Sequence, residues 1–293
     1  MIKGILLSGG TGSRLHPTTI SFSKQLLPVY DKPMIYYPIS ILMLAGIREI
    51  LIITNHEYIE NYKRLLGNGD KFGIKFKYLV QKKPNGIAES FILGEKFIGN
   101  DDVCLILGDN IFYGNNLIKL ISKSINILKL KKEATIFGYH AKEPNKYGVA
   151  KIDKNSNLLK IIEKPKSYIG DIAITGFYIY PKDVISKAKF NKPSKRGELE
   201  ITFINNMFIK EKRMNLSILD RGFTWLDMGT PDSLLEASNL IQSIEKRQNF
   251  KIACLEEIAL NNNLINKNKL RKNLKKYYNN DYKEYLLKLI NKK

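Results

Sequence analysis

The sequence predicts an α/β protein whose core is a mostly parallel β-sheet covered by helices. Two observations lead to this prediction. Short apolar runs of strand length recur along the first half of the 293-residue chain, and helix-length stretches with apolar residues at helical spacing lie between them. This β-α-β alternation is typical of a parallel sheet, because a strand that is buried on both faces is apolar along its whole length.

The expected elements follow in chain order. In the first half, strands are expected at residues 2–7, 50–54, 76–80, 103–107 and 134–139, and helices at 34–45, 57–66, 86–98 and 116–128. In the second half, strands are expected at residues 148–153, 158–163, 172–180, 215–219 and 223–226, with a helix at about 198–210. Pro231 begins a long helical C-terminus, because proline is favoured in the first turn of a helix. With neither a Gly/Ser linker nor an internal repeat, one compact catalytic unit is expected.

The sequence also indicates a compartment. No run approaches the roughly 18 apolar residues of a membrane span, and the first ten residues do not resemble a signal peptide. The two cysteines, Cys104 and Cys254, are too few for a disulfide framework and show no metal-binding spacing. We therefore expect a cytoplasmic protein without membrane insertion.

Nearly half of the net charge of +20 lies at the end of the chain. Residues 261–293 contain ten Lys or Arg and two acids, among many asparagines. The charge fits polyanionic substrates, a nucleic-acid surface or a compositional bias of solvated helices. The last interpretation is favoured for the tail, since no zinc-finger, helix-turn-helix or RNP motif is present, and no specific nucleic-acid partner is expected.

A glycine-rich turn directly follows the first strand, at residues 8–15. Such a turn lets backbone N–H groups approach phosphate oxygens closely, although a tight turn without a ligand has the same pattern. It is not a Walker A loop, which needs Lys-Ser/Thr, nor a dinucleotide fingerprint, which needs glycine where Leu15 stands. Arg14 and Lys24 favour a triphosphate, because arginine binds its oxygens bidentately and lysine adds a point charge.

Two aspartates end apolar strands, and carboxylates at such positions face the crevice of an open α/β sheet. Asp109 follows residues 103–107 and Asp227 follows residues 223–226. Together they predict a Mg²⁺ site completed by substrate phosphates, although each alone could be a turn former or helix cap. Lys164 and Glu163 could bind a sugar phosphate and sugar hydroxyls, or form an exposed ion pair.

The chain resembles the sugar nucleotidylyltransferase family, in particular its bacterial glucose-1-phosphate thymidylyltransferase branch. The resemblance covers nearly the whole chain and is most specific at residues 4–15, 23–38, 108–114, 196–202 and 225–227. It implies a Rossmann-like fold of the nucleotide-diphospho-sugar transferase type, with an inserted sugar-binding half and a helical C-terminus. It also implies a catalytic domain at residues 1–230, with a nucleotide side at about 1–115 and a sugar-phosphate side at about 140–230. Residues 231–293 would be a helical extension.

The implied reaction is a direct in-line displacement: dTTP and α-D-glucose 1-phosphate give dTDP-glucose and pyrophosphate, with Mg²⁺, for deoxysugar, surface polysaccharide and lipopolysaccharide synthesis. By resemblance the nucleotide would be bound by Gly9, Gly10, Gly12, Ser13, Arg14, Lys24, Gln25, Gln81, Gly86 and Asp109, with Gln81 and Gly86 at the thymine edge. The sugar phosphate would be bound by Asn110, Tyr147, Gly148, Glu163, Lys164, Ile174 and Trp225, and the metal by Asp109 and Asp227. Arg14, Lys24 and Lys164 would offset the charge of the reacting phosphates. A feedback-regulated homotetramer is implied as well.

Several positions depart from the family pattern. Ser8 stands where alanine is usual, Phe203 where aspartate is common and Met228 where threonine is usual, while Asp171-Ile172 replaces Asn-Tyr. None of these removes a proposed ligand. A UTP-using uridylyltransferase is an alternative, because a glutamine amide pairs with thymine and uracil alike. An inactive sugar-nucleotide-binding regulator is another.

Overall fold

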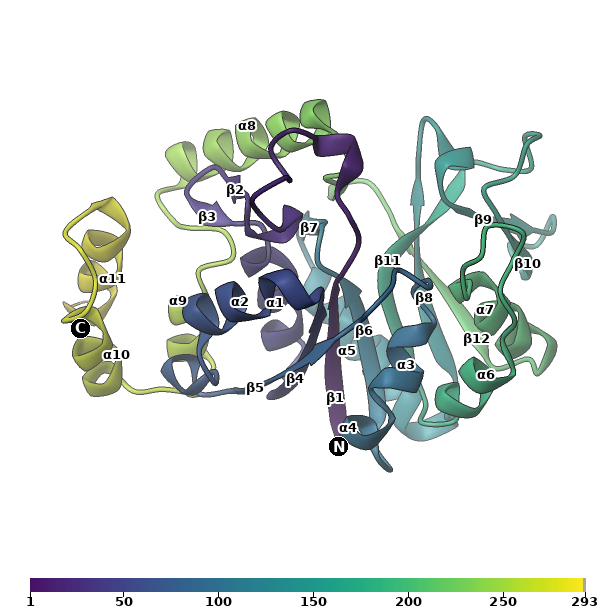
Figure 1. Cartoon of the computed structure of the whole chain (residues 1–293), viewed down its shortest axis with the longest axis horizontal. Helices are drawn as coiled ribbons and strands as arrows, with labels where there is room; N and C mark the ends of the chain where they lie inside the picture. Colours follow the sequence, from purple (N-terminus) through teal and green to yellow (C-terminus); the bar gives the residue numbers. More distant parts are fainter. Residues whose placement is uncertain (292–293) are drawn as a thin grey trace.

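The structure is a computed structural model that describes residues 1–291. Its centre is a nine-stranded sheet that runs across the molecule (Figure 1). One path through the sheet is β10 (Leu158–Glu163), β9 (Gly148–Ile152), β11 (Ile172–Tyr180), β6 (Asp102–Leu107), β1 (Ile2–Ser8), β4 (Glu49–Thr54) and β5 (Lys75–Val80). The remaining two strands are β8 (Ala134–His140), which pairs with β11, and β12 (Met214–Leu219), which pairs with β8.

The pairing directions divide the sheet into two parts. Strands β6, β1, β4 and β5 are parallel neighbours, as the β-α-β alternation predicts. β11 is antiparallel to β6 and β8, and β9 and β10 form an antiparallel pair beside it. The predicted α/β architecture is therefore confirmed, and β11 joins these parallel strands to the strand-rich second half of the chain.

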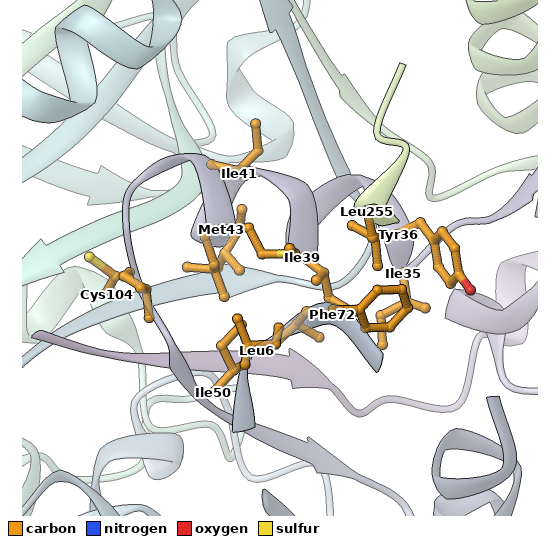
Figure 2. Packing of buried hydrophobic residues seen from close by; sticks show 14 of the residues in the cluster. Leu6, Ile35, Tyr36, Ile39, Ile41, Met43, Ile50, Phe72, Cys104 and Leu255 are labelled. Atoms are coloured by element: carbon orange, nitrogen blue, oxygen red, sulfur yellow. The ribbon is translucent and has the colours of Figure 1, made fainter. Parts of the chain in front are cut away.

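Helices cover both faces of the sheet. One face carries α1 (Tyr36–Leu44), α2 (Ile59–Leu66), α5 (Leu117–Lys131) and α9 (Leu255–Asn261). The other carries α3 (Glu89–Leu93), α4 (Glu95–Ile98), α6 (Val184–Phe190) and α7 (Ile201–Lys210). Successive strand residues point to opposite faces, so Leu6 packs in the cluster around α1 (Figure 2). Ile5, its neighbour in the strand, packs against the other layer. This is why the central strands β1, β4 and β6 are mostly apolar.

Some elements differ from the sequence-based expectation. The helix predicted at residues 86–98 is two short helices with Gly94 between them, and α1 is buried from Tyr36 to Met43 instead of being amphipathic. Among the helices and strands, α6, β7 (Asn110–Gly114) and the two-residue strands β2 (Pro28–Val29) and β3 (Lys32–Pro33) were not predicted. β7 pairs with β13 (Phe223–Asp227) in a separate two-stranded sheet. A five-residue strand that follows a tight turn has too short a periodicity to be recognised.

The C-terminus is helical, as Pro231 predicts. Helix α8 (Pro231–Gln248) is capped at its N-terminus by Thr230, whose side chain accepts a hydrogen bond from the Ser233 backbone N–H in a capping box. α9, α10 (Lys267–Leu274) and α11 (Asp281–Asn291) follow. Several of their apolar side chains, such as Leu270 and Leu286, are buried and most of their lysines are exposed, which fits solvated helices. Residues 292–293 of the basic tail lie outside the described residues. No helix within residues 1–291 is long and apolar enough to cross a membrane.

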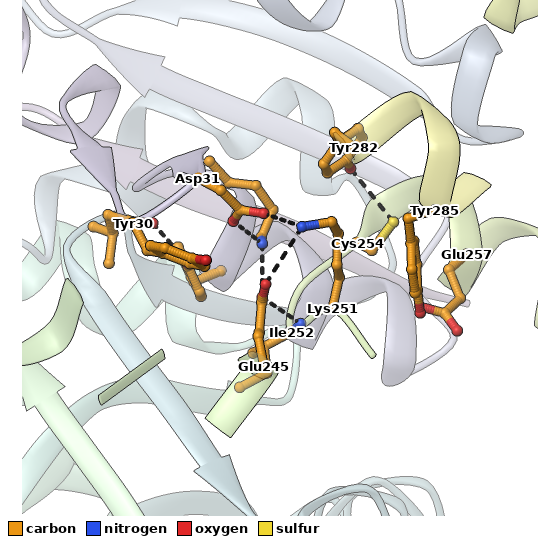
Figure 3. Close-up of polar contacts among 12 residues, drawn as sticks. Tyr30, Asp31, Glu245, Lys251, Ile252, Cys254, Glu257, Tyr282 and Tyr285 are labelled. Carbon is orange, nitrogen blue, oxygen red and sulfur yellow. Dashed lines mark hydrogen bonds and ion pairs between the residues drawn. The ribbon is translucent and has the colours of Figure 1, made fainter. Parts of the chain in front are cut away.

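A buried ionic cluster joins the N-terminal half to this helical C-terminus (Figure 3). Lys32 lies in the small hairpin of β2 (Pro28–Val29) and β3 (Lys32–Pro33). Its Nζ contacts Asp31 and lies 2.9 Å from Glu245 Oε1, and Lys251 contacts the same two carboxylates. The Lys32 side chain is only 1% exposed, so its charge depends on these partners. The cluster therefore fixes the segment that follows Lys24 against α8.

Candidate active site

The predicted site residues meet where parallel strands end at one edge of the sheet. Leu7 of β1 and Leu107 of β6 are register partners, and the Gly108 backbone N–H donates to Leu7 O at 2.8 Å. The glycine-rich turn after β1 and Asp109 after β6 therefore leave the sheet side by side. In the small second sheet, Asp227 is the register partner of Asn110. This pairing places Asp227 next to Asp109, although 118 positions separate them in the chain.

Two clefts adjoin at this edge. The larger has a volume of about 670 Å³ and the smaller of about 210 Å³. Both are bordered by Ile87, Leu107, Asp109 and Glu198. Asp109 thus stands at the junction, where groups bound in the two clefts would come together.

The larger cleft contains every residue that the sequence assigns to the sugar phosphate, namely Asn110, Tyr147, Gly148, Glu163, Lys164, Ile174 and Trp225. It also contains Asp109, Asp227, Ser13 and Arg14. The smaller cleft contains Gly9, Gly10, Gln25, Gln81 and Gly86 together with Asp109. Gly12 and Lys24 border neither cleft. Gly12 lies inside the turn, where its carbonyl accepts a hydrogen bond from Thr19 Oγ1 at 2.9 Å, and Lys24 pairs with Asp109.

Polar contacts fix both oxygens of the Asp109 carboxylate. Lys24 Nζ donates to Oδ2 at 2.5 Å, and Asn110 Nδ2 donates to Oδ1 at 2.9 Å. Asn110 Oδ1 in turn accepts from Trp225 Nε1 at 2.6 Å and from the Gly176 backbone at 3.0 Å. The Asn110 amide therefore connects β7, β13 and β11, and it holds Asp109 in place as well as bordering the larger cleft.

The two carboxylates differ in their electrostatic environment. Burial, followed by the nearby charge of Asp109, raises the pKa of Asp227 to about 6, although Lys24, Arg14 and Lys164 oppose the shift. Burial also acts on Asp109, but the Lys24 charge and the hydrogen bonds from Lys24 and Asn110 outweigh it and lower the pKa of that carboxyl. Ionised Asp227 therefore destabilises the unliganded protein. Its folded-state pKa exceeds the unfolded value, so stability falls as the pH rises from about 4 to about 6.

This pair fits a magnesium ion. Mg²⁺ prefers oxygen ligands, binds through one or two carboxylates and takes its remaining ligands from water and phosphates. A cation between Asp109 and Asp227 would remove the repulsion that raises the Asp227 pKa. Among residues 1–291, no group of three or more His, Cys, Asp or Glu side chains gathers as a metal site, so a closed all-protein cage is not the arrangement here.

The larger cleft is lined by both cations and carboxylates. Lys164 has a left-handed backbone conformation, with φ of 41°, and its N–H donates to Tyr147 O at 2.9 Å. Glu163 accepts a hydrogen bond from Thr202 Oγ1 at 2.5 Å, and burial raises its pKa. Arg14 also borders the cleft. The arrangement suits an anionic group flanked by hydroxyls.

Sequence reasoning assigned no role to Arg196 and Glu89. Arg196 borders the larger cleft, with its Nη2 3.0 Å from Glu198 Oε1 and its Nη1 3.6 Å from Glu163 Oε1. The one available signal was that residues 196–202 belong to a stretch resembling the family. Glu89 gives no local signal, because its partner Gln81 lies on another element.

The chain is similar to known proteins. The sequence model of a family described as "Nucleotidyl transferase" matches residues 3–244. A glucose-1-phosphate thymidylyltransferase of Neisseria gonorrhoeae is 50% identical over 291 residues, which cover 99% of this chain and all of that protein. One of Mycobacterium tuberculosis is 41% identical over 289 residues, 99% of each chain.

Solved structures with this fold are also similar. A putative glucose-1-phosphate thymidylyltransferase from Bacillus anthracis, crystallised with a sucrose, superposes with a TM-score of 0.75 at 40% identity and covers 82% of this chain and 95% of its own. A UDP-glucose pyrophosphorylase with UDP-glucose has a TM-score of 0.73 at 25% identity, with coverage of 83% and 100%.

Proposed function

This chain belongs to the nucleotidyl transferase family, and from that membership we propose that it transfers a thymidylyl group from dTTP to α-D-glucose 1-phosphate. The products are dTDP-glucose and pyrophosphate, and dTDP-glucose supplies deoxysugar synthesis. Relatives at 40–50% identity over nearly the whole chain carry this activity in their names, whereas the pyrophosphorylase neighbour is less similar.

One observation carries the proposal at the level of the site. Asp109 stands at the junction of two clefts, one beside the glycine-rich turn and one lined by Lys164 and Glu163, and Asp227 borders the second of these clefts. We assign the smaller cleft to the nucleotide base and the larger to the sugar phosphate. The α-phosphate of the nucleotide would then lie at the junction, within reach of both partners.

The proposed reaction needs no nucleophilic side chain. A phosphate oxygen of glucose 1-phosphate attacks the α-phosphorus of dTTP, a new P–O bond forms, and the bond to the pyrophosphate oxygen opposite it breaks. Bringing two polyanions together is opposed by their repulsion, which Arg14 and Lys164 offset from the walls of the larger cleft. Asn110 and Lys24 hold the Asp109 carboxylate in one orientation.

We propose that Asp109 and Asp227 hold Mg²⁺ in the working enzyme. When bound, the ion neutralises charge on the reacting phosphates and orients them. The two carboxylates supply the oxygen ligands, and the repulsion between them supports this assignment.

The substrate assignment is tested by pyrophosphate release. With Mg²⁺ and glucose 1-phosphate, turnover is expected with dTTP and to a smaller extent with UTP, because a pocket for the thymine methyl group separates them by only about 1–3 kcal/mol. The purified chain is assayed with each NTP and dNTP in turn. Absence of turnover with every nucleotide would refute an enzymatic role and favour a binding regulator, and a preference for UTP would favour a uridylyltransferase.

We further propose a cytoplasmic homotetramer. Both cysteines are free and buried, which suits a reducing compartment. Leu226, Leu235 and Leu240 line an open groove on α8 and β13, and Leu235 is 62% exposed, so this face suits contact with a second copy. Sedimentation equilibrium is expected to give the mass of four chains, reduced by Leu235→Glu. A monomer at micromolar concentration contradicts the assembly.

A further inference from the structure

Gln81 places an amide at the floor of the smaller cleft. It directly follows β5, is 5% exposed, and its backbone N–H donates to Thr54 O at 2.8 Å. Its Oε1 faces Gly9, since a Cβ on Gly9 would lie only 2.7 Å from that oxygen. Glycine at position 9 therefore leaves the space in front of the amide oxygen open.

The amide nitrogen of Gln81 is directed away from a ligand. Nε2 donates to Glu89 Oε2 at 2.6 Å and lies 3.5 Å from Gly86 O. A primary amide has two N–H donors, so these two acceptors use both of them. Rotating the amide by 180° would bring Oε1 against the Glu89 carboxylate, where two acceptors repel. The oxygen is thus the atom of Gln81 that remains for a ligand.

Glu89 and Gly86, the residues that accept from Gln81 Nε2, are held in place by further contacts. Glu89 Oε1 accepts a hydrogen bond from Asn85 Nδ2 at 2.7 Å. The Leu199 backbone N–H donates to Asn85 O at 2.6 Å, and the Ala88 N–H donates to Leu199 O at 3.2 Å. Gly86 has φ of 106° and lies against the Leu199 backbone, which leaves no space for a side chain. These contacts with Leu199 therefore hold the loop before α3 in place.

We propose that Glu89 is a positioning residue that selects the base by fixing the amide orientation of Gln81. With Oε1 directed toward the ligand, the site accepts a pyrimidine whose N3 carries a hydrogen, as in thymine or uracil. Cytosine presents a lone pair at N3, which would face the acceptor oxygen of Gln81. This inference rests on the proposed function, because it assigns the smaller cleft to the base.

The inference is tested by replacing Glu89, the residue that accepts the hydrogen bond from Gln81 Nε2. Glu89→Leu removes both carboxylate oxygens, so the Gln81 amide becomes free to rotate and to donate from Nε2 to cytosine. The preference for dTTP over dCTP, measured as the ratio of kcat/KM, is expected to fall about tenfold, the equivalent of one net hydrogen bond. The change is expected in KM for both nucleotides, with kcat for dTTP within about threefold of the parent value. Glu89→Gln keeps one acceptor oxygen where Glu89 uses two, for Gln81 and Asn85, and is expected to lose only part of the preference.

A matched control is available on the next helix. Glu95 pairs with Lys189, so Glu95→Leu removes a carboxylate close in sequence without touching the Gln81 amide. Its dTTP preference is expected to equal that of the parent. If Glu89→Leu does not fold, as judged by its melting temperature, Glu89→Ala serves in its place.

Calorimetric titration with dTTP and dCTP separates this inference from the enzymatic proposal, since it needs no turnover. An unchanged dTTP preference in folded Glu89→Leu or Glu89→Ala overturns the role of Glu89, even if the enzyme is active. A reduced binding preference supports that role even if no nucleotide turns over. An equal loss of preference in Glu95→Leu would also overturn it.

Discussion

Asp109→Asn and Asp227→Asn are each expected to lower turnover by about a hundredfold to a thousandfold and to raise the Mg²⁺ concentration needed for half-maximal rate. Each substitution keeps the size of the side chain and removes one of the two charges that we assign to the ion. Because both would act on one ion, the double variant is expected to lose much less than the product of the two single losses. The measurement is the rate against Mg²⁺ concentration for the three variants.

The same variants are expected to differ in stability. Burial and Asp109 raise the pKa of Asp227 to about 6, so Asp227→Asn removes a destabilising charge above that pH. Its melting temperature without substrates is expected to rise at pH 8, by about 2 °C or more, and to match the parent at pH 4. Asp109→Asn is expected to lower the melting temperature, since Lys24, whose side chain is 10% exposed, loses its ion-pair partner.

Turn-forming or capping aspartates would behave differently. The free energy of unfolding of each single variant would then fall by about 1 kcal/mol, and its melting temperature would fall with it. The dependence of the rate on Mg²⁺ concentration would match that of the parent. That result would show that the pair is structural and has no part in metal binding.

Lys164→Met is expected to lower turnover by about a hundredfold or more, because a charge that borders the larger cleft no longer offsets the reacting phosphates. Lys164→Gly is expected to lose as much activity without losing stability. The backbone φ of 41° is unfavourable for lysine and available to glycine, so the substitution relieves strain. The measurements are kcat, KM for glucose 1-phosphate and the melting temperature of each variant.

Lys166 provides the control for this prediction. It is exposed two residues further along and does not border the larger cleft. Lys166→Met removes the same charge from the protein and is expected to leave kcat within about twofold of the parent. A similar loss in both variants would indicate a general effect of net charge, and an active Lys164→Met would exclude the proposed role.

The parallel half of the fold was predictable from the sequence because its signals are local. Ile2–Ser8 and Asp102–Leu107 are largely buried on both faces, so apart from Lys3, Ser8 and Asp102 they carry no polar side chain. Parallel strands exit at one edge of a sheet, which is why the glycine-rich turn and Asp109 were expected together. Pro231 likewise predicted the start of α8 from one position. Helix α6 and strand β7 are short, and their periodicity was too weak to identify.

The details of the site were decided only by the tertiary structure. Pairing between β7 and β13 brings Asp227 beside Asp109, and it lets Trp225 donate to Asn110 from 115 positions away. Resemblance named Lys24 as a phosphate ligand, but only folding shows that it pairs with Asp109. The role proposed for Glu89 becomes visible only when the fold places Gln81 beside it. The sequence by itself determined the strands and helices through periodicity over a few residues, whereas these contacts join distant segments whose complementary charges and hydrogen-bonding groups meet only when the sheet and its loops pack.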